Sequence, residues 1–178
     1  SITVPAFPMP VVAAKVRSQI TQAGALGDPY GSGTRTVWWV YGVGPVKVEF
    51  DHAGGSGAAV TTAVLMSTNQ TPEAPPPDAN YFPLTLGLKG KYSWTNSKYM
   101  TKPEVESYSI TQVANGSAEI SVQSVSGPIK VDGAYDFTTR LDGVTTLSSA
   151  TKAQSLVKAP PLGPRSLPAA KRRHFFTP

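Results

Sequence analysis

The sequence predicts an all-β protein, made of two diverged antiparallel units that form a sandwich or a half-open barrel. Three observations predict this class. Turn-forming residues are abundant, with 16 glycines and 17 prolines in 178 residues. Several stretches alternate apolar and polar residues or are rich in β-branched and aromatic residues, which is typical of strands. Hydrophobic residues make up 40% of the chain, enough for a core, and charged residues only 15%.

The first half of the chain carries strand and turn signals in alternation. Val12, Val16 and Ile20 are four residues apart and would also fit a helix, but the β-branched content of their stretch favours a strand. A Gly-Val-Gly-Pro sequence supplies the turn of a hairpin. The predicted elements are an extended lead-in or edge strand over 1–10, strands over 11–23 and 59–68, a hairpin of 34–41 with 45–51, and a turn over 53–58.

The second half repeats this organisation after a break. Residues 69–80 hold four prolines and predict a linker between a first unit, 1–68, and a second unit, 81–157. Residues 158–178 are rich in proline and basic residues, and we expect a tail that is mobile or bound to a partner. The predicted strands are 90–96, 104–113, 118–125 and 128–141, with Asn-Gly or Asp-Gly turns at 115–116, 132–133 and 142–143.

Short matches recur in the same order in both halves and predict a tandem repeat. GPVKV begins at Gly44 and GPIKV at Gly127; VTTAVLMST begins at Val60 and VTTLSSAT at Val144. The closing HFFTP resembles the NYFPL that opens the second unit. We therefore expect the chain to be a segment of a longer array.

Two segments resemble parts of a known kind of module. YFPLTLGLKGKYSWTN, residues 81–96, looks like the opening of modules in uncharacterised bacterial secreted or lipoprotein-type β-repeat proteins, and VWWVYGVGPVKVEF, residues 37–50, is similar to their closing hairpin. Lys91 and Tyr92 depart from the pattern, since such modules usually have a tryptophan earlier in the strand. The resemblance implies an extracellular or cell-envelope setting and a curved antiparallel sheet, and it brings no catalytic residues.

Charge and composition argue against several classes of protein. The net charge is +5, but residues 1–150 hold ten basic and eleven acidic residues, so the excess lies in the tail. A nucleic-acid-binding fold would carry a basic face on its body, and we predict no nucleic-acid partner. The absence of cysteine excludes disulfides and cysteine nucleophiles. No apolar run approaches the roughly 20 residues of a transmembrane helix.

The adjacent tryptophans are the candidate binding residues. Successive side chains of a strand point to opposite faces, so Trp38 and Trp39 cannot both face one core. We expect one to be buried as an apolar anchor and the other to be covered from within the chain, by a ligand or by a partner. The predicted ligand-binding residues are Trp38, Trp39 and Tyr41.

Candidate catalytic and metal-binding residues are few. Glu104 and Glu106 are two apart and share a face of a strand, as the paired carboxylates of a glycoside hydrolase would require, although such neighbours are ordinarily solvated. Asp51 and His52 have no third ligand nearby in the sequence. We therefore predict no metal site, no cofactor and no enzyme activity, with a hydrolase that uses the glutamate pair as a weak alternative.

These observations lead to one functional hypothesis and one alternative. The first is a non-catalytic secreted or cell-envelope β-repeat module for surface interaction or architecture, with further copies or surface components as partners. The alternative is a carrier of a small hydrophobic or lipid-like ligand in a β cavity lined by Trp38 or Trp39.

Overall fold

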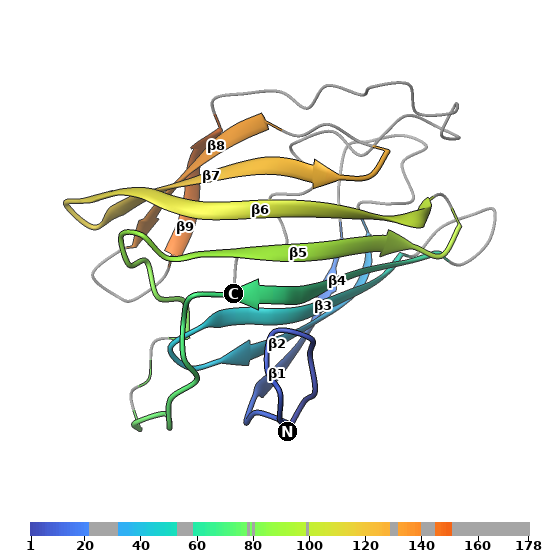
Figure 1. Ribbon diagram of the computed structural model, residues 1–178, viewed down its shortest axis with the longest axis horizontal. Helices are drawn as coiled ribbons and strands as arrows, with labels where there is room; N and C mark the ends of the chain where they lie inside the picture. Colours follow the sequence, from blue (N-terminus) through green and yellow to red (C-terminus); the bar gives the residue numbers. More distant parts are fainter. Residues whose placement is uncertain are drawn as a thin grey trace.

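The computed structural model of the chain describes residues 1–21, 32–52, 59–77, 79, 81–98, 100–128, 132–139 and 145–150. These residues form nine strands joined by eight antiparallel pairings in one sheet, in chain order from β1 to β9 (Figure 1). The all-β class is confirmed, and the described residues form no helix. The predicted tail, 158–178, and the predicted turns at 53–58 and 142–143 lie outside the described residues.

Every strand pairs with the next one along the chain. The bounds are β1 Ala14–Ile20, β2 Gly33–Val40, β3 Gly44–His52, β4 Ala59–Thr68, β5 Lys89–Asn96, β6 Met100–Ala114, β7 Ser117–Ser126, β8 Asp132–Thr139 and β9 Thr145–Ala150. Within the stretch 11–23, which fits a strand or a helix, Ala14–Ile20 form a strand, and residues 22–23 lie outside the described residues. Strand β4 pairs directly with β5, so the sheet continues across the proline-rich segment predicted as a linker.

Alternation along the strands gives the sheet two different faces. Val37, Val48, Ala63 and Trp94 stand opposite one another in register and are buried. We call the face that carries them the inner face and the opposite face the outer face. The predicted alternation of the hairpin is confirmed, because the apolar residues of β3 point inward while Lys47, Glu49 and Asp51 point outward.

Two apolar clusters cover the inner face. One consists mainly of residues from β2 to β5, and the other of Leu88 with residues from β6 to β8. Phe82, in the segment before β5, packs against both clusters. Its ring lies 5.8 Å from Trp39 of β2 and 5.8 Å from Phe137 of β8, in edge-to-face geometry. A single aromatic side chain thus bridges strands that are six positions apart in the sheet.

The N-terminal residues close a gap in the sheet. The pairing of β3 with β4 ends at Lys47 and Val64, and beyond that point the amide of Ala6 donates a hydrogen bond to the carbonyl of Leu65. Ile2 and Val11 form a two-way backbone bridge, and Val4 between them is buried. The expected lead-in over 1–10 is therefore a folded loop that contributes to the core.

Two turn predictions have different outcomes. Asn115 and Gly116 join β6 to β7 with φ values of 51° and 74°, the left-handed conformation of a tight hairpin turn. The predicted turn at Asp132 and Gly133 is wrong, because both residues belong to β8 and pair with Gln123 and Val122. Asp-Gly favours a turn locally, but a full strand on the open side of β7 offered more hydrogen bonds.

Strand β9 was not predicted on its own signals. Only their similarity to the stretch that begins at Val60 marks its residues in the sequence. Within the described part of the chain there is also no helix long and apolar enough to cross a membrane.

Candidate functional site

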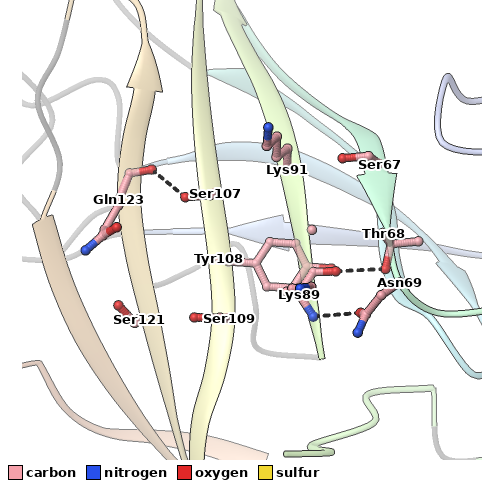
Figure 2. Close-up of a pocket in the computed structure, with 11 residues that line it drawn as sticks. Ser67, Thr68, Asn69, Lys89, Lys91, Ser107, Tyr108, Ser109, Ser121 and Gln123 are labelled. Carbon is pink, nitrogen blue, oxygen red and sulfur yellow. Dashed lines mark hydrogen bonds between the residues drawn. The ribbon is translucent and has the colours of Figure 1, made fainter. Parts of the chain in front are cut away.

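A groove of about 590 Å³ lies on the sheet where β4, β5, β6 and β7 run side by side (Figure 2). Its lining is polar and contains hydroxyl, amide and ammonium groups. The lining residues are Ser67, Thr68, Asn69, Lys89, Gly90, Lys91, Ser107, Tyr108, Ser109, Ser121 and Gln123.

The register explains why these side chains gather. On β5 the lysines at 89 and 91 stand opposite the serines at 109 and 107 of β6. Those serines in turn stand opposite Ser121 and Gln123 of β7. Since Glu106 and Ile110 of β6 are buried on the inner face, alternation places the serines between them on the outer face. Small side chains in the middle and longer ones at the sides create the hollow.

A clasp at the end of β4 fixes the wall of the groove. Asn69 Oδ1 accepts a hydrogen bond from the amide of Lys89 at 2.9 Å, and its Nδ2 donates to the carbonyl of Gly87 at 3.0 Å. Thr68 Oγ1 donates to the carbonyl of Lys89 at 3.2 Å (Figure 2). One side-chain amide therefore continues the ladder between β4 and β5 by two bonds after the strand itself has ended.

A pair of tyrosines supports the groove from below. Gly90 has no side chain, and the ring of Tyr108 occupies the space next to it. The ring centroids of Tyr108 and Tyr92 are 5.2 Å apart, and the Tyr92 hydroxyl donates a hydrogen bond to the carbonyl of Pro45. Burial raises the pKa of both phenols above the ordinary value of 10.0, well above it for Tyr92, where the neighbouring Tyr108 adds to the effect.

The electrostatics of the groove are one-sided. Two exposed ammonium groups, from Lys89 and Lys91, belong to the lining, and no carboxylate does. Two carboxylates lie near the β7 side of the groove: Asp132 of β8 stands opposite Gln123, and Glu119, on the outer face of β7 itself, is two residues before Ser121. Glu119 Oε1 accepts a hydrogen bond of 2.6 Å from Thr111. Positive charge therefore lies on β5, and negative charge lies on β7 and β8.

The structure places Trp38 and Trp39 on opposite faces, as predicted. Trp39 is 5% exposed on the inner face and contacts Phe82. Trp38 is half-buried on the outer face, where the ammonium groups of Lys15 and Lys47 each lie 5.0 Å from the ring centroid. Such contacts stabilise by about 0.5–1 kcal/mol each at exposed sites. The ring of Trp38 is thus covered by side chains of the neighbouring strands.

Tyr41 belongs to a third environment. It lies in the turn between β2 and β3, and its ring is 6.0 Å from that of Tyr81. Its carbonyl accepts a hydrogen bond from the amide of Glu73. The three predicted ligand-binding residues are therefore not brought together, and their role in binding stays a prediction.

The paired glutamates are not solvated, so that expectation was wrong. Glu104 is 0% exposed and Glu106 is 5% exposed. They lie on the inner face because they stand opposite Trp94 and Tyr92 of β5 in register. Glu104 Oε1 accepts a hydrogen bond of 3.0 Å from Ser124 Oγ. The two-residue spacing did place both on one face, but the sequence alone did not reveal which face.

His52 is part of a buried polar row that crosses β3, β4 and β5. Its Nε2 lies 2.7 Å from Thr61 Oγ1, which also accepts a hydrogen bond of 3.0 Å from Asn96 Nδ2. Its ring packs 4.2 Å from that of Phe50. Asp51 points to the opposite face. Among the described residues, no group of three or more histidine, aspartate or glutamate side chains could hold a metal ion.

The groove was missed by sequence reasoning, although a signal was present. Lys89 and Lys91, Ser107 and Ser109, and Ser121 and Gln123 are polar pairs with strand spacing. Only the register shows that the three pairs lie side by side. Comparisons of this chain with protein-family models, with curated proteins and with solved structures find no match.

Proposed function

We propose that the chain is a non-catalytic module of the extracellular space or the cell envelope, and that it holds another molecule in the groove over β4 to β7. The observation that carries this proposal is the concentration of polar side chains from four strands around one hollow of about 590 Å³. Ligand pockets are concave, and a small number of well-placed polar groups fixes the orientation of the ligand in them. The extracellular setting rests on the resemblance of residues 37–50 and 81–96 to secreted β-repeat modules.

The chemistry of the lining favours binding over catalysis. General acid–base catalysis uses carboxylate or imidazole groups in most cases, and the groove is lined by hydroxyl, amide and ammonium groups. Glu104, Glu106 and His52 point to the inner face, away from the groove. Glu104, Glu106 and His52 are therefore on the opposite side of the sheet from the groups that could hold a ligand.

We also propose that the sheet forms a half-open barrel around its inner face. The support is the bridge from Trp39 through Phe82 to Phe137, since these contacts require β2 and β8 to approach the same ring. Such curvature would leave the outer face as the contact surface. The proposed repeat places β3 and β4 in correspondence with β8 and β9, and Gly44 and Gly127 both have positive φ values.

The experiment fills the groove with a bulky side chain. Ser109→Trp places an indole among the lining residues, whereas Thr36→Trp places one on the outer face of β2, away from the groove. Each protein is incubated with purified bacterial cell-wall polymer, and the sedimented fraction is measured. The native chain and Thr36→Trp should sediment with the polymer, and Ser109→Trp should stay in solution.

Two results would contradict the proposal. One is a native chain that does not sediment with the cell-wall polymer at any concentration tested. The other is equal sedimentation of both tryptophan variants, which would place the contact surface elsewhere. Circular dichroism of each variant checks that its sheet is intact.

A further inference from the structure

We infer that the groove binds an acidic polysaccharide, a hydroxyl-rich chain whose sugars carry carboxylates. This inference rests on the proposed binding function and names the class of its ligand. Three properties of the groove lead to it: the sign of its charge, the kind of hydrogen-bonding groups on its floor, and the absence of a free aromatic surface among its lining residues.

The charge favours an anion. Lys89 and Lys91 are both exposed and lie two residues apart on the same face of β5, which corresponds to about 6.8 Å along a strand. Repeated carboxylates of a polymer could meet both ammonium groups in succession. Because Asp132 lies on β8 and Glu119 on β7, the carboxylates of the ligand should turn toward β5.

The floor favours a ligand with many hydroxyl groups. Ser107, Ser109 and Ser121 present hydroxyls that can donate and accept hydrogen bonds, and the Gln123 amide can do both as well. Ser107 Oγ is 3.3 Å from the carbonyl of Gln123, a weak bond that a ligand can replace. Lysines alone would suit any anion; the hydroxyl floor between them and Gln123 suits a sugar.

The aromatic content argues against other polymers. Tyr108 is the aromatic residue of the lining, and its ring packs against Tyr92 and beside Gly90 rather than standing free. Single-stranded nucleic acids bind by stacking their bases on free aromatic rings. A neutral polysaccharide has no anionic group, so it would leave the ammonium groups of both Lys89 and Lys91 without a charged partner. The groove is three interstrand spacings wide, about 14 Å, which leaves room for a sugar chain that runs along β5 past Lys89 and Lys91.

The test compares ligands that differ only in charge. Binding of an oligogalacturonate of defined length is measured by calorimetry at low salt, beside the same oligomer with its carboxylates methyl-esterified. The native chain should bind the acid at least about tenfold more tightly than the ester. Raising the salt concentration should weaken binding of the acid, since exposed charges are screened.

Matched variants locate the site. Lys89→Gln/Lys91→Gln removes the two ammonium groups of the groove and should weaken binding of the acid about tenfold. Lys15→Gln/Arg17→Gln removes the same charge, with the same spacing, from the outer face of β1, and should change it less than about twofold. Asp132→Asn should strengthen binding, because it removes a carboxylate next to Gln123.

Each other outcome overturns the inference. Equal affinity for acid and ester would show that charge does not select the ligand, and would leave the proposed binding function standing. Equal weakening in both double variants would place the anion outside the groove. Equal affinity for the oligogalacturonate and for a single-stranded DNA of the same charge would show that the groove does not select a polysaccharide. No binding of the oligogalacturonate would reject the ligand class, whereas sedimentation with cell-wall polymer tests the proposed function by itself.

Discussion

Gly90 of β5 lies against the side chain of Tyr108 so closely that no larger residue fits between them. A Cβ atom at position 90 would stand 2.8 Å from both Cε1 and Oη of Tyr108, and 2.6 Å from the carbonyl oxygen of Ser67. The missing side chain therefore lets the tyrosine ring pass beneath the groove. Stability and the shape of the groove depend on the same glycine.

Substitution of this glycine should be costly. Gly90→Ala forces a shift of the Tyr108 ring or of the β4 backbone, and overpacking of this kind costs about 1–3 kcal/mol. Urea unfolding measures the loss. Ser93→Ala on the same strand is the control, because Ser93 points outward and is half-buried. A difference below about 0.5 kcal/mol between the two variants would show that the ring moves freely.

The Asn69 clasp should contribute measurably to stability although it is exposed. Asn69→Ala removes both bonds to the segment before β5, and a typical hydrogen bond contributes about 0.5–1.5 kcal/mol. Asn69→Asp keeps the acceptor for the Lys89 amide and removes the donor to Gly87, so it should cost less than alanine. Urea unfolding of both variants, with Gln70→Ala as control, gives the order. Equal losses in the two Asn69 variants would contradict the assignment of separate bonds.

Alkaline pH should destabilise the fold through the buried tyrosine pair. Burial raises the pKa of Tyr92 and Tyr108, so the folded chain keeps protons that the unfolded chain loses above about pH 10. The contribution is complete below pH 10 and is lost as the pH rises toward the folded values. The free energy of unfolding should fall by up to about 1.4 kcal/mol per pH unit for each tyrosine.

Unfolding in urea at pH 8, 9, 10 and 11 checks this dependence. Tyr108→Phe should show a smaller slope above pH 10 than the native chain. Tyr81→Phe, which removes a hydroxyl outside the buried pair, should keep the native slope. The explanation is wrong if Tyr108→Phe loses stability with pH as steeply as the native chain does.

The hairpin and the inner face show which features of the sheet can be predicted from the sequence and which cannot. Alternation in 45–51 correctly separated the inward from the outward residues, because a strand with one buried face must alternate. The same rule placed Glu104 and Glu106 on one face and could not say which, since burial depends on Trp94 and Tyr92 in the neighbouring strand. The sequence does not predict the groove for the same reason, because its lining residues are brought together by the register between four strands.

Local turn chemistry was reliable only where no partner strand competed with it. Asn115 and Gly116 form the predicted turn, whereas Asp132 and Gly133 pair with β7 instead. Gly133 is buried opposite Val122, so its lack of a side chain serves the inner face. The preference of a dipeptide for a turn contributes only a fraction of the stability of a paired strand. It is therefore overridden where the same residues can form the hydrogen bonds of a whole ladder.

Gly44 and Gly127, the first residues of the two matching pentapeptides, should respond differently to alanine. Both have left-handed backbones, with φ values of 102° and 120°. At Gly44 the nearest neighbour of an added Cβ is Pro83 Cδ at 3.9 Å, so Gly44→Ala should cost only the backbone strain, about 1–2 kcal/mol. At Gly127 the same atom would lie 2.5 Å from Glu104 Oε2 and 2.7 Å from the backbone α-carbon of Glu104.

Gly127→Ala should therefore be the more damaging change by at least about 1–3 kcal/mol, because a clash is added to the strain. Shortening the glutamate should not restore stability, since Glu104→Ala leaves the backbone of residue 104 in place, 2.7 Å from the added methyl group. Urea unfolding of Gly44→Ala, Gly127→Ala and Gly127→Ala/Glu104→Ala measures all three. Equal losses of stability for Gly44→Ala and Gly127→Ala would contradict this expectation. They would mean that residue 127 moves away from Glu104 at little cost, and that the closer packing around Gly127 does not distinguish it from Gly44.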